Sequence, residues 1–140
     1  MSAATDPQHR RPTGVDDLTV DAVGRISEAF DLLQRARGAL YTFHQQIGWV
    51  DDTLSDGLEM LREAGHVDLA DELAGNWVGR NVIPGMWTFE LIEAFERTYY
   101  EVAVASERQV RETVMDGRQH IQEAERKVRR RQDGPTDDEG

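Results

Sequence analysis

Residues 22–50 read AVGRISEAFDLLQRARGALYTFHQQIGWV, and their apolar side chains recur at alternating intervals of four and three residues. This spacing predicts a long amphipathic helix, over about Leu18–Trp49, that packs along a partner helix through a heptad seam. One row of the seam is mostly alanine, which lets the partner helix approach closely. The seam consists of Ala22, Ile26, Ala29, Leu33, Ala36, Leu40, Phe43, Ile47 and Val50.

A second apolar stripe begins at Ile92 and continues to Val128 without a proline. It predicts a last helix over about Thr88–Arg131, with the Thr88 hydroxyl as its N-cap. At 1.5 Å per residue this helix would span roughly 65 Å, against roughly 50 Å for the first helix. The chain is therefore expected to contain two long helices of unequal length.

Two short helices are expected between the long ones, over about 53–64 and 68–80. Gly48 and the Asp51–Thr53 cluster predict a break after the first long helix, and Gly65 is a typical C-terminal stop for the short helix that follows. Pro84 and Gly85 then suit the centre of a type II turn.

These patterns together predict an all-α fold. Two long antiparallel helices form a coiled-coil-like hairpin, and the short helical pair lies at its turn end, giving an elongated bundle. The helical bundle domain is expected at 17–132. A disordered arm is expected at 1–16, which is poor in apolar residues, and a disordered acidic tail at 133–140.

The unequal helix lengths predict a surface for a partner. In an antiparallel pair the first helix ends opposite residue 118, so Ile121, Ala124 and Val128 would project beyond it. Burying this continued stripe is favourable by about 25 cal/mol per Å². A second copy or another protein would supply the cover, and the alternative is that the N-terminal arm folds back over the stripe.

The loop before the last helix is the second predicted docking surface. Val82, Ile83, Met86 and Trp87 would form an exposed apolar patch there. The alternative is a local aromatic core at the turn end, in which Trp87 joins Trp49 and Trp77 and locks the short helices in place.

Charge and composition limit the classes of function that this protein can have. The net charge is −11 and the pI about 4.7, which argues against a nucleic-acid binder or a protein of anionic membrane surfaces. There is no cysteine, and residues 1–19 lack the apolar region of a signal peptide, so a cytoplasmic protein is expected. Of the sixteen basic residues all but Lys127 are arginine, a bias typical of a GC-rich bacterial genome.

The charges are also unevenly distributed. Residues 51–72 contain eight acidic residues against Arg62 alone, whereas Arg126–Arg131 form a basic end of the last helix. Opposite charges at two places in one chain predict that electrostatics sets the orientation of any self-association. The alternative for the basic end is a favourable interaction with the negative end of the helix dipole.

Two pairs of side chains have the spacing of metal ligands. Glu63 and His66 match the Glu-x-x-His motif of carboxylate di-iron bundles, but the chain has no second motif and Gly65 interrupts the helix between them. Asp116 and His120 lie four residues apart and are expected to pair with each other. No metal site, catalytic residue or cofactor is predicted.

Leu69–Gly75 faintly resembles the first helix and turn of a helix-turn-helix, followed by a segment, Asn76–Ile83, that is too short for a recognition helix. The leading hypothesis is therefore a non-enzymatic interaction or scaffold protein, self-associating or a subunit of a larger assembly. The alternatives are a ferritin-like metal-binding bundle and a DNA-binding regulator.

Overall fold

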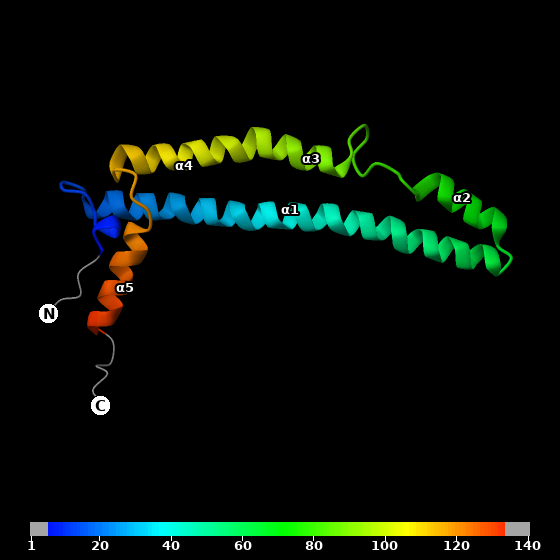
Figure 1. The fold of residues 1–140 in the computed structure, drawn as a ribbon, viewed down its shortest axis with the longest axis horizontal. Helices are drawn as coiled ribbons and strands as arrows, with labels where there is room; N and C mark the ends of the chain where they lie inside the picture. The colour runs from blue at the N-terminus through cyan, green and yellow to red at the C-terminus, as the bar shows by residue number, and fades with distance from the viewer. Residues whose placement is uncertain (1–5, 134–140) are drawn as a thin grey trace, which may run out of the picture. The chain divides into compact units, whose positions relative to one another are not determined.

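A computed structural model describes residues 6–133, and helices make up most of this part of the chain (Figure 1). The described residues contain no strand, only an isolated bridge between Ile83 and Met86. The all-α class is thus confirmed. The elements are the 3₁₀ turn η1 (Pro7–His9), α1 (Asp17–Glu63), α2 (Val67–Trp77), α3 (Thr88–Phe95), the π-helical turn η2 (Glu96–Tyr100), α4 (Glu101–Val114) and α5 (Ile121–Asp133).

The helix α1 is continuous over 47 residues, so the predicted break at Gly48 and Asp51–Thr53 is wrong. A glycine in a helix costs up to about 1 kcal/mol, but Leu54 and Leu58 extend the apolar stripe past it, and Leu58 is only 5% exposed. Burying a leucine contributes about 1.5–3 kcal/mol, which outweighs the local preference for a break.

Both ends of α1 follow the sequence signals. At the start, the Asp16 carboxylate accepts a hydrogen bond from the Thr19 amide at 2.8 Å, as expected of an N-cap. At the end, Gly65 has a φ of +94°, and the amide of His66 donates to the carbonyl of Leu61 while the amide of Gly65 donates to that of Arg62. This pair of hydrogen bonds is a Schellman motif, which confirms Gly65 as the stop signal.

The chain folds into two compact units. Unit 1 contains residues 1–33 and 101–140, and unit 2 contains residues 34–100. The helix α1 therefore contributes its first part to unit 1 and its remainder to unit 2. Each unit has buried residues of its own.

Unit 1 has a small core of aliphatic side chains and one methionine. Val20 and Val23 of α1 pack with Met115, which is fully buried, and with Ile121, which is 4% exposed. Val15, Val110 and Val114 lie around this cluster. The core joins the start of α1 to the end of α4 and the start of α5.

The single last helix predicted over Thr88–Arg131 is wrong, because α4 ends at Val114 and α5 begins only at Ile121. The intervening backbone has positive φ at Asp116, Gly117 and His120. The periodic stripe passes through this segment, but folding α5 back buries Ile121 within its own chain. Ile121 therefore does not project beyond an intramolecular partner, and the expected overhang does not form there.

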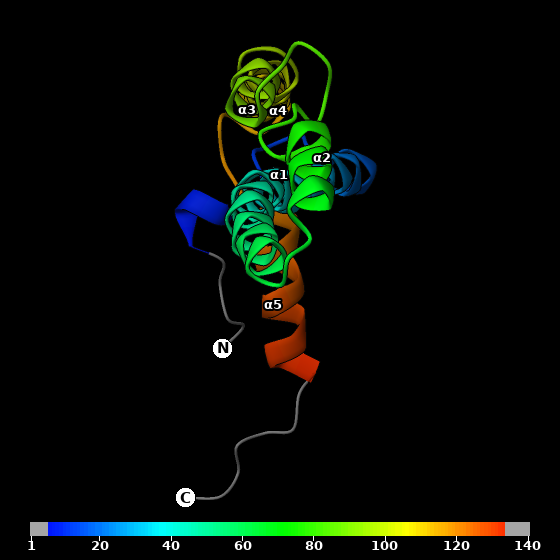
Figure 2. The same ribbon diagram turned by 90° about the vertical axis from the view of Figure 1, so that its right-hand side faces the viewer.

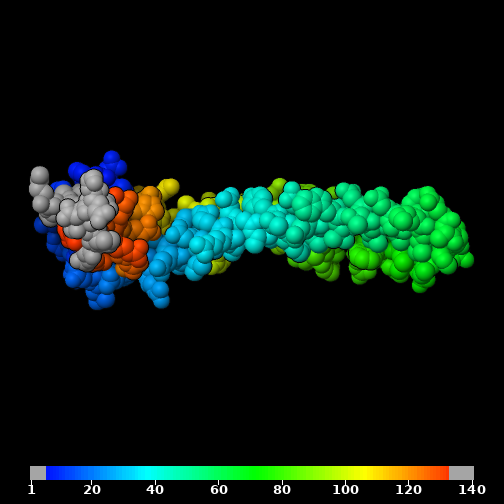
Figure 3. All heavy atoms as spheres, turned by 90° about the horizontal axis from the view of Figure 1, so that it is seen from below, coloured from blue at the N-terminus to red at the C-terminus, as the bar shows by residue number. Residues whose placement is uncertain are grey.

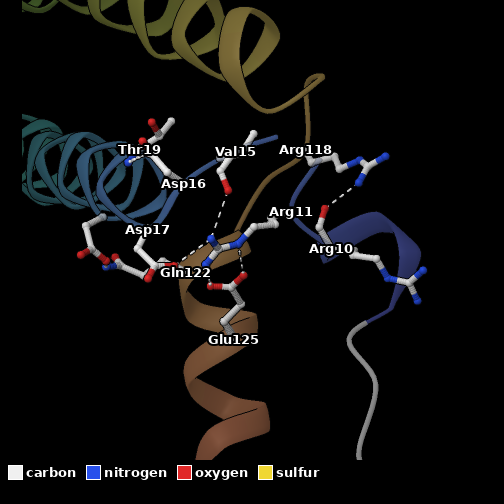
Figure 4. A network of polar contacts seen from close by, with 10 residues as sticks. Arg10, Arg11, Val15, Asp16, Asp17, Thr19, Arg118, Gln122 and Glu125 are labelled. Atoms are coloured by element: carbon white, nitrogen blue, oxygen red, sulfur yellow. Dashed lines mark hydrogen bonds and ion pairs between the residues drawn. The ribbon is translucent and has the colours of Figure 1, made fainter. Parts of the chain in front are cut away.

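The residues before α1 pack against α5 (Figure 4). Arg11 donates from Nε and Nη2 to both carboxylate oxygens of Glu125, at 2.8 and 3.0 Å, and from Nη1 to Asp17 at 2.8 Å. Arg118 donates to the carbonyl of Arg10 at 2.6 Å, and Pro12 is buried. A disordered arm was expected over 1–16, but its described part, 6–16, makes these contacts, while residues 1–5 and 134–140 lie outside the described residues.

In unit 2 the part of α1 from residue 34 onward contacts the segment 88–100 in reversed order. Gln34 bonds to Tyr100 at 2.9 Å, Arg37 to Glu96 at 2.6 Å and His44 to Thr88 at 2.6 Å. The two segments thus run antiparallel within this unit. Thr88 begins α3 but is not its N-cap, because its hydroxyl lies on the His44 ring nitrogen and Trp87 holds the cap position without a side-chain hydrogen bond.

A tight turn precedes α3. The amide of Met86 donates to the carbonyl of Ile83 at 3.0 Å, and Gly85 has a φ of +74°. A hydrogen bond from residue i+3 to residue i with positive φ at i+2 is the signature of a type II turn, which confirms the prediction made from Pro84 and Gly85.

Gly24 allows α5 to cross α1 in unit 1. A Cβ at this position would collide with the Gln122 amide and lie 3.1 Å from the Gln122 Cβ. The Gln122 amide donates to Asp21 at 3.0 Å in this arrangement. Gly38 lies on the same helix, and a Cβ there would meet nothing within 4 Å. A side chain at position 24 would therefore clash with α5, whereas a side chain at position 38 would not.

We expect Gly24→Leu to destabilise the protein and Gly38→Leu to stabilise it. The first change overpacks the crossing, displaces α5 and loosens Ile121 and Met115, at a cost of about 1–3 kcal/mol in the free energy of unfolding. The second gains helix propensity, worth about 0.5–1 kcal/mol. Urea denaturation followed by circular dichroism measures both, and a Gly24→Leu protein as stable as the wild type would contradict the close contact.

Candidate docking groove

An open apolar groove lies in unit 2, between the end of α1 and the end of α2. It has a volume of about 660 Å³. Figures 1 and 2 show α2 lying back along the end of α1. The groove is lined by Gln46, Trp49, Val50, Thr53, Leu54, Gly57, Leu58, Leu61 and Trp77.

The groove exists because α2 covers only one side of the apolar residues that it packs on. Contacts of Asp71 with Arg62 and of Gly79 with Asp51 place α2 along this part of α1, yet Trp77 is the one α2 residue that lines the groove. Ala70 of α2 is fully buried, so the helix makes one close contact and leaves the remaining stripe open. Seen from below, the face of α1 that is turned away from α2 and α3 has no other element of unit 2 over it (Figure 3).

Two polar contacts hold α2 in place. Near its start, Arg62 donates to Asp71 at 2.8 Å, and just after its end the amide of Gly79 donates to Asp51 at 3.3 Å. Both contacts join α1 to α2 or its C-terminal extension. They hold Trp77 at the groove, because they fix the helix near its two ends.

Two tryptophans form exposed walls of the groove, and a leucine forms its floor. Trp49 is 57% exposed and Trp77 is 51% exposed, whereas Leu58 is buried. Large aromatic side chains exposed together mark surfaces that bind a partner. The expected aromatic core of Trp49, Trp77 and Trp87 is wrong, since Trp87 is also exposed and pairs edge-on with Phe89.

The surroundings of the groove are acidic. Asp52 follows the lining residue Trp49 by three positions and Asp56 follows Thr53 by three, which places both on the outer side of the Trp49 wall, and both are exposed. Of the nine charged residues in 51–72 only Arg62 is basic, and it is paired with Asp71. The groove therefore lies in a negative potential.

A polar cluster elsewhere in unit 2 joins α1 to the π-helical turn η2. Glu96 accepts hydrogen bonds from Arg37 at 2.6 Å and from the Tyr41 hydroxyl at 2.9 Å, and the Arg37 guanidinium lies 4.3 Å from the centre of the Tyr100 ring. The hydrogen bond from Arg37 is the main cause that lowers the pKa of Glu96. The bond to Glu96 in turn raises the pKa of Tyr41, because it favours the neutral phenol.

The structure places the predicted docking residues in two different environments. In unit 2, Val82, Ile83 and Trp87 are 45%, 41% and 62% exposed, and Met86 is half-buried, so the predicted loop patch is accessible. In unit 1, Ile121 belongs to the core. Ala124 and Val128 are half-buried and line a polar hollow beside charged residues such as Lys127 and Arg131.

The two pairs with the spacing of metal ligands lie at helix ends or in the break between helices. Glu63 ends α1 and His66 lies at the N-cap position of α2, beyond Gly65. His120 lies 3.4 Å from Glu123 rather than pairing with Asp116, because both residues of the predicted pair lie in the break between helices. Within residues 6–133, no three His, Asp or Glu side chains are placed to share a metal ion.

The segment Asn76–Ile83 is not a recognition helix, since α2 ends at Trp77 and Val78 is extended. The basic residues Arg126–Arg131 all lie on α5, in its last turns. No helix between residues 6 and 133 combines the length and the hydropathy that a bilayer crossing requires.

Comparison with known proteins adds no relative: no family model, curated protein or solved structure matches the chain.

The sequence analysis did not predict the groove. The pattern shows that Leu54, Leu58 and Leu61 are apolar, but not that α2 packs along only one side of them. The available signal was the presence of two tryptophans beside a run of acidic residues, because such a run keeps a surface solvated.

We expect the ion pair at Glu96 to make unit 2 less stable in acid. The pKa of Glu96 in the folded protein lies below the ordinary value of 4.5, so its contribution is present above that pH and is lost as the pH falls through the lowered pKa. The Glu96→Gln variant lacks this contribution. Its unfolding midpoint should therefore fall less between about pH 6 and about pH 3 than that of the wild type.

The three tryptophans all belong to unit 2, so their fluorescence reports the unfolding of this unit. The matched control is Glu93→Gln, a change at an exposed glutamate three residues earlier, which should keep the wild-type pH dependence. Equal pH dependence of the wild type and Glu96→Gln would rule out the ion pair as a source of acid sensitivity.

Proposed function

We propose that this protein is a non-enzymatic interaction or scaffold protein of the cytoplasm, which self-associates or forms a subunit of a larger assembly. The observation that carries the proposal is the apolar groove of unit 2 with Trp49 and Trp77 exposed at its walls. Covering half of each indole would remove roughly 200 Å² from water, a gross gain of about 5 kcal/mol. Only part of this gain would appear as affinity, since association has its own entropic cost.

The architecture that we propose for this role is the hairpin of two long antiparallel helices. Two sets of contacts support it. In unit 2, α1 pairs in reversed order with the segment 88–100, and in unit 1 the valines at the start of α1 pack with those at the end of α4. A rigid helical support would hold the groove and the loop at 82–87 in constant geometry.

The groove can be closed without disturbing the fold. Gly57 lines it, and a Cβ at this position would meet nothing within 4 Å. Gly48 lies on the same helix, is equally unobstructed and does not line the groove. The Gly57→Leu and Gly48→Leu variants are therefore a matched pair, in which both gain helix propensity and only the first fills the groove.

We expect the wild type and Gly48→Leu to retain the same bound protein, or the same oligomer, while Gly57→Leu loses it. Light scattering on the purified chains measures self-association, and affinity capture from the native host with mass spectrometry measures partners. If all three proteins are monomeric and retain identical proteins, the groove has no part in binding and the proposed function fails.

A further inference from the structure

We propose that the groove binds a basic amphipathic helix of about four turns, supplied by another protein; this inference rests on the proposed function and names the chemistry of its partner. The lining of α1 extends from Gln46 to Leu61, about 22 Å along the helix axis. A helix of about 15 residues has the same length.

The shape of the groove favours a helix. Its floor is a stripe of leucines that follows the axis of α1, and its wall on the other side comes from α2. A third helix can place apolar side chains at positions i, i+3, i+4 and i+7 along such a stripe, which is the common mode of helix binding in grooves. Trp49 and Trp77, both exposed, supply broad aromatic faces for those side chains.

The charge around the groove indicates which charged residues a partner helix would carry on its polar face. Asp52 and Asp56 lie one turn from groove residues and are exposed, and the whole segment 51–72 has only one basic residue, already paired. Lys or Arg residues along the edges of a bound helix would face these carboxylates. Such complementarity raises the association rate and discriminates against acidic partners.

The same charges argue against a second copy of this chain as the occupant. A symmetric pair would place two acidic segments against each other. The basic helix α5 of a second copy offers little apolar surface, because Ile121 is buried in the core of unit 1 and only Ala124 and Val128 remain, both half-buried. These two small side chains would not fill a groove of about 660 Å³.

The test uses the full chain and two synthetic helical peptides of about 15 residues. Both peptides have leucines at i, i+3, i+4 and i+7 spacing; one has lysines at the remaining positions and the other has glutamates. A Trp87→Phe variant leaves Trp49 and Trp77, the two tryptophans of the groove, as the fluorescent reporters. The lysine peptide should shift their emission to shorter wavelength.

We expect the lysine peptide to bind at least tenfold more tightly than the glutamate peptide at low salt, with the difference shrinking as salt is added. Adding Gly57→Leu should weaken lysine-peptide binding at least tenfold, whereas Gly48→Leu should leave it unchanged. Asp52→Asn with Asp56→Asn should reduce the preference for lysine without abolishing binding, because the apolar contacts remain.

Equal binding of both peptides, or full binding by Gly57→Leu, would overturn the inference. It would also be overturned if the wild type is a dimer that Gly57→Leu converts to a monomer, since the occupant would then be a second copy. If neither peptide binds while Gly57→Leu still loses the proteins captured by the wild type, the partner chemistry is wrong and the proposed function stands.

Discussion

The long helix α1 provides the surface on which the other elements pack. It continues through Gly48 and the acidic residues at 51 and 52 because each further turn adds aliphatic contacts that exceed the local cost of a glycine or an aspartate. In unit 1 the start of α1 packs with α4 and α5 through Val20 and Val23, and in unit 2 the helix contacts α2 and the segment 88–100. The predicted seam is wrong over the first part of α1, because Ile26 is 42% exposed and the alanines of the seam are exposed as well. In unit 2, α2 covers one side of the apolar residues at 46–61, and the groove is the side that is left open.

Local sequence signals predicted the turns well where the geometry is fixed by one or two residues. The Gly65 stop and the Pro84-Gly85 turn both form as expected, because each depends on nearby hydrogen bonds and on a positive φ. The same kind of signal failed at Gly48, where a glycine stands inside α1. Gly65 and Gly48 are indistinguishable by residue type. Their difference lies in whether the following residues can continue the buried stripe.

The break after Val114 could not be predicted from periodicity, because the apolar residues keep their spacing through it. Met115 and Ile121 are more deeply buried in the core of unit 1 than they would be on a straight helix beyond the end of its partner. This gain depends on Gly24, which admits α5, and on Arg11, which reaches Glu125. Contacts between residues more than one hundred positions apart cannot be derived from a local pattern. The groove was missed for a related reason, since the pattern shows that Leu54 and Leu61 are apolar but not how far α2 will cover them.

The acidic residues beside the groove address a problem that the exposed indoles create. An uncovered apolar surface with two tryptophans favours nonspecific association between copies of a chain. Like charges at the same surface oppose that association at the ionic strength of a cell, where the Debye length is about 8 Å. The same carboxylates would not weaken the binding of a basic partner, because they would attract its positive charges. In the proposed complex, Asp52 and Asp56 would account both for the attraction of a basic partner and for the repulsion between identical copies, without contributing to the apolar contacts that would supply the affinity.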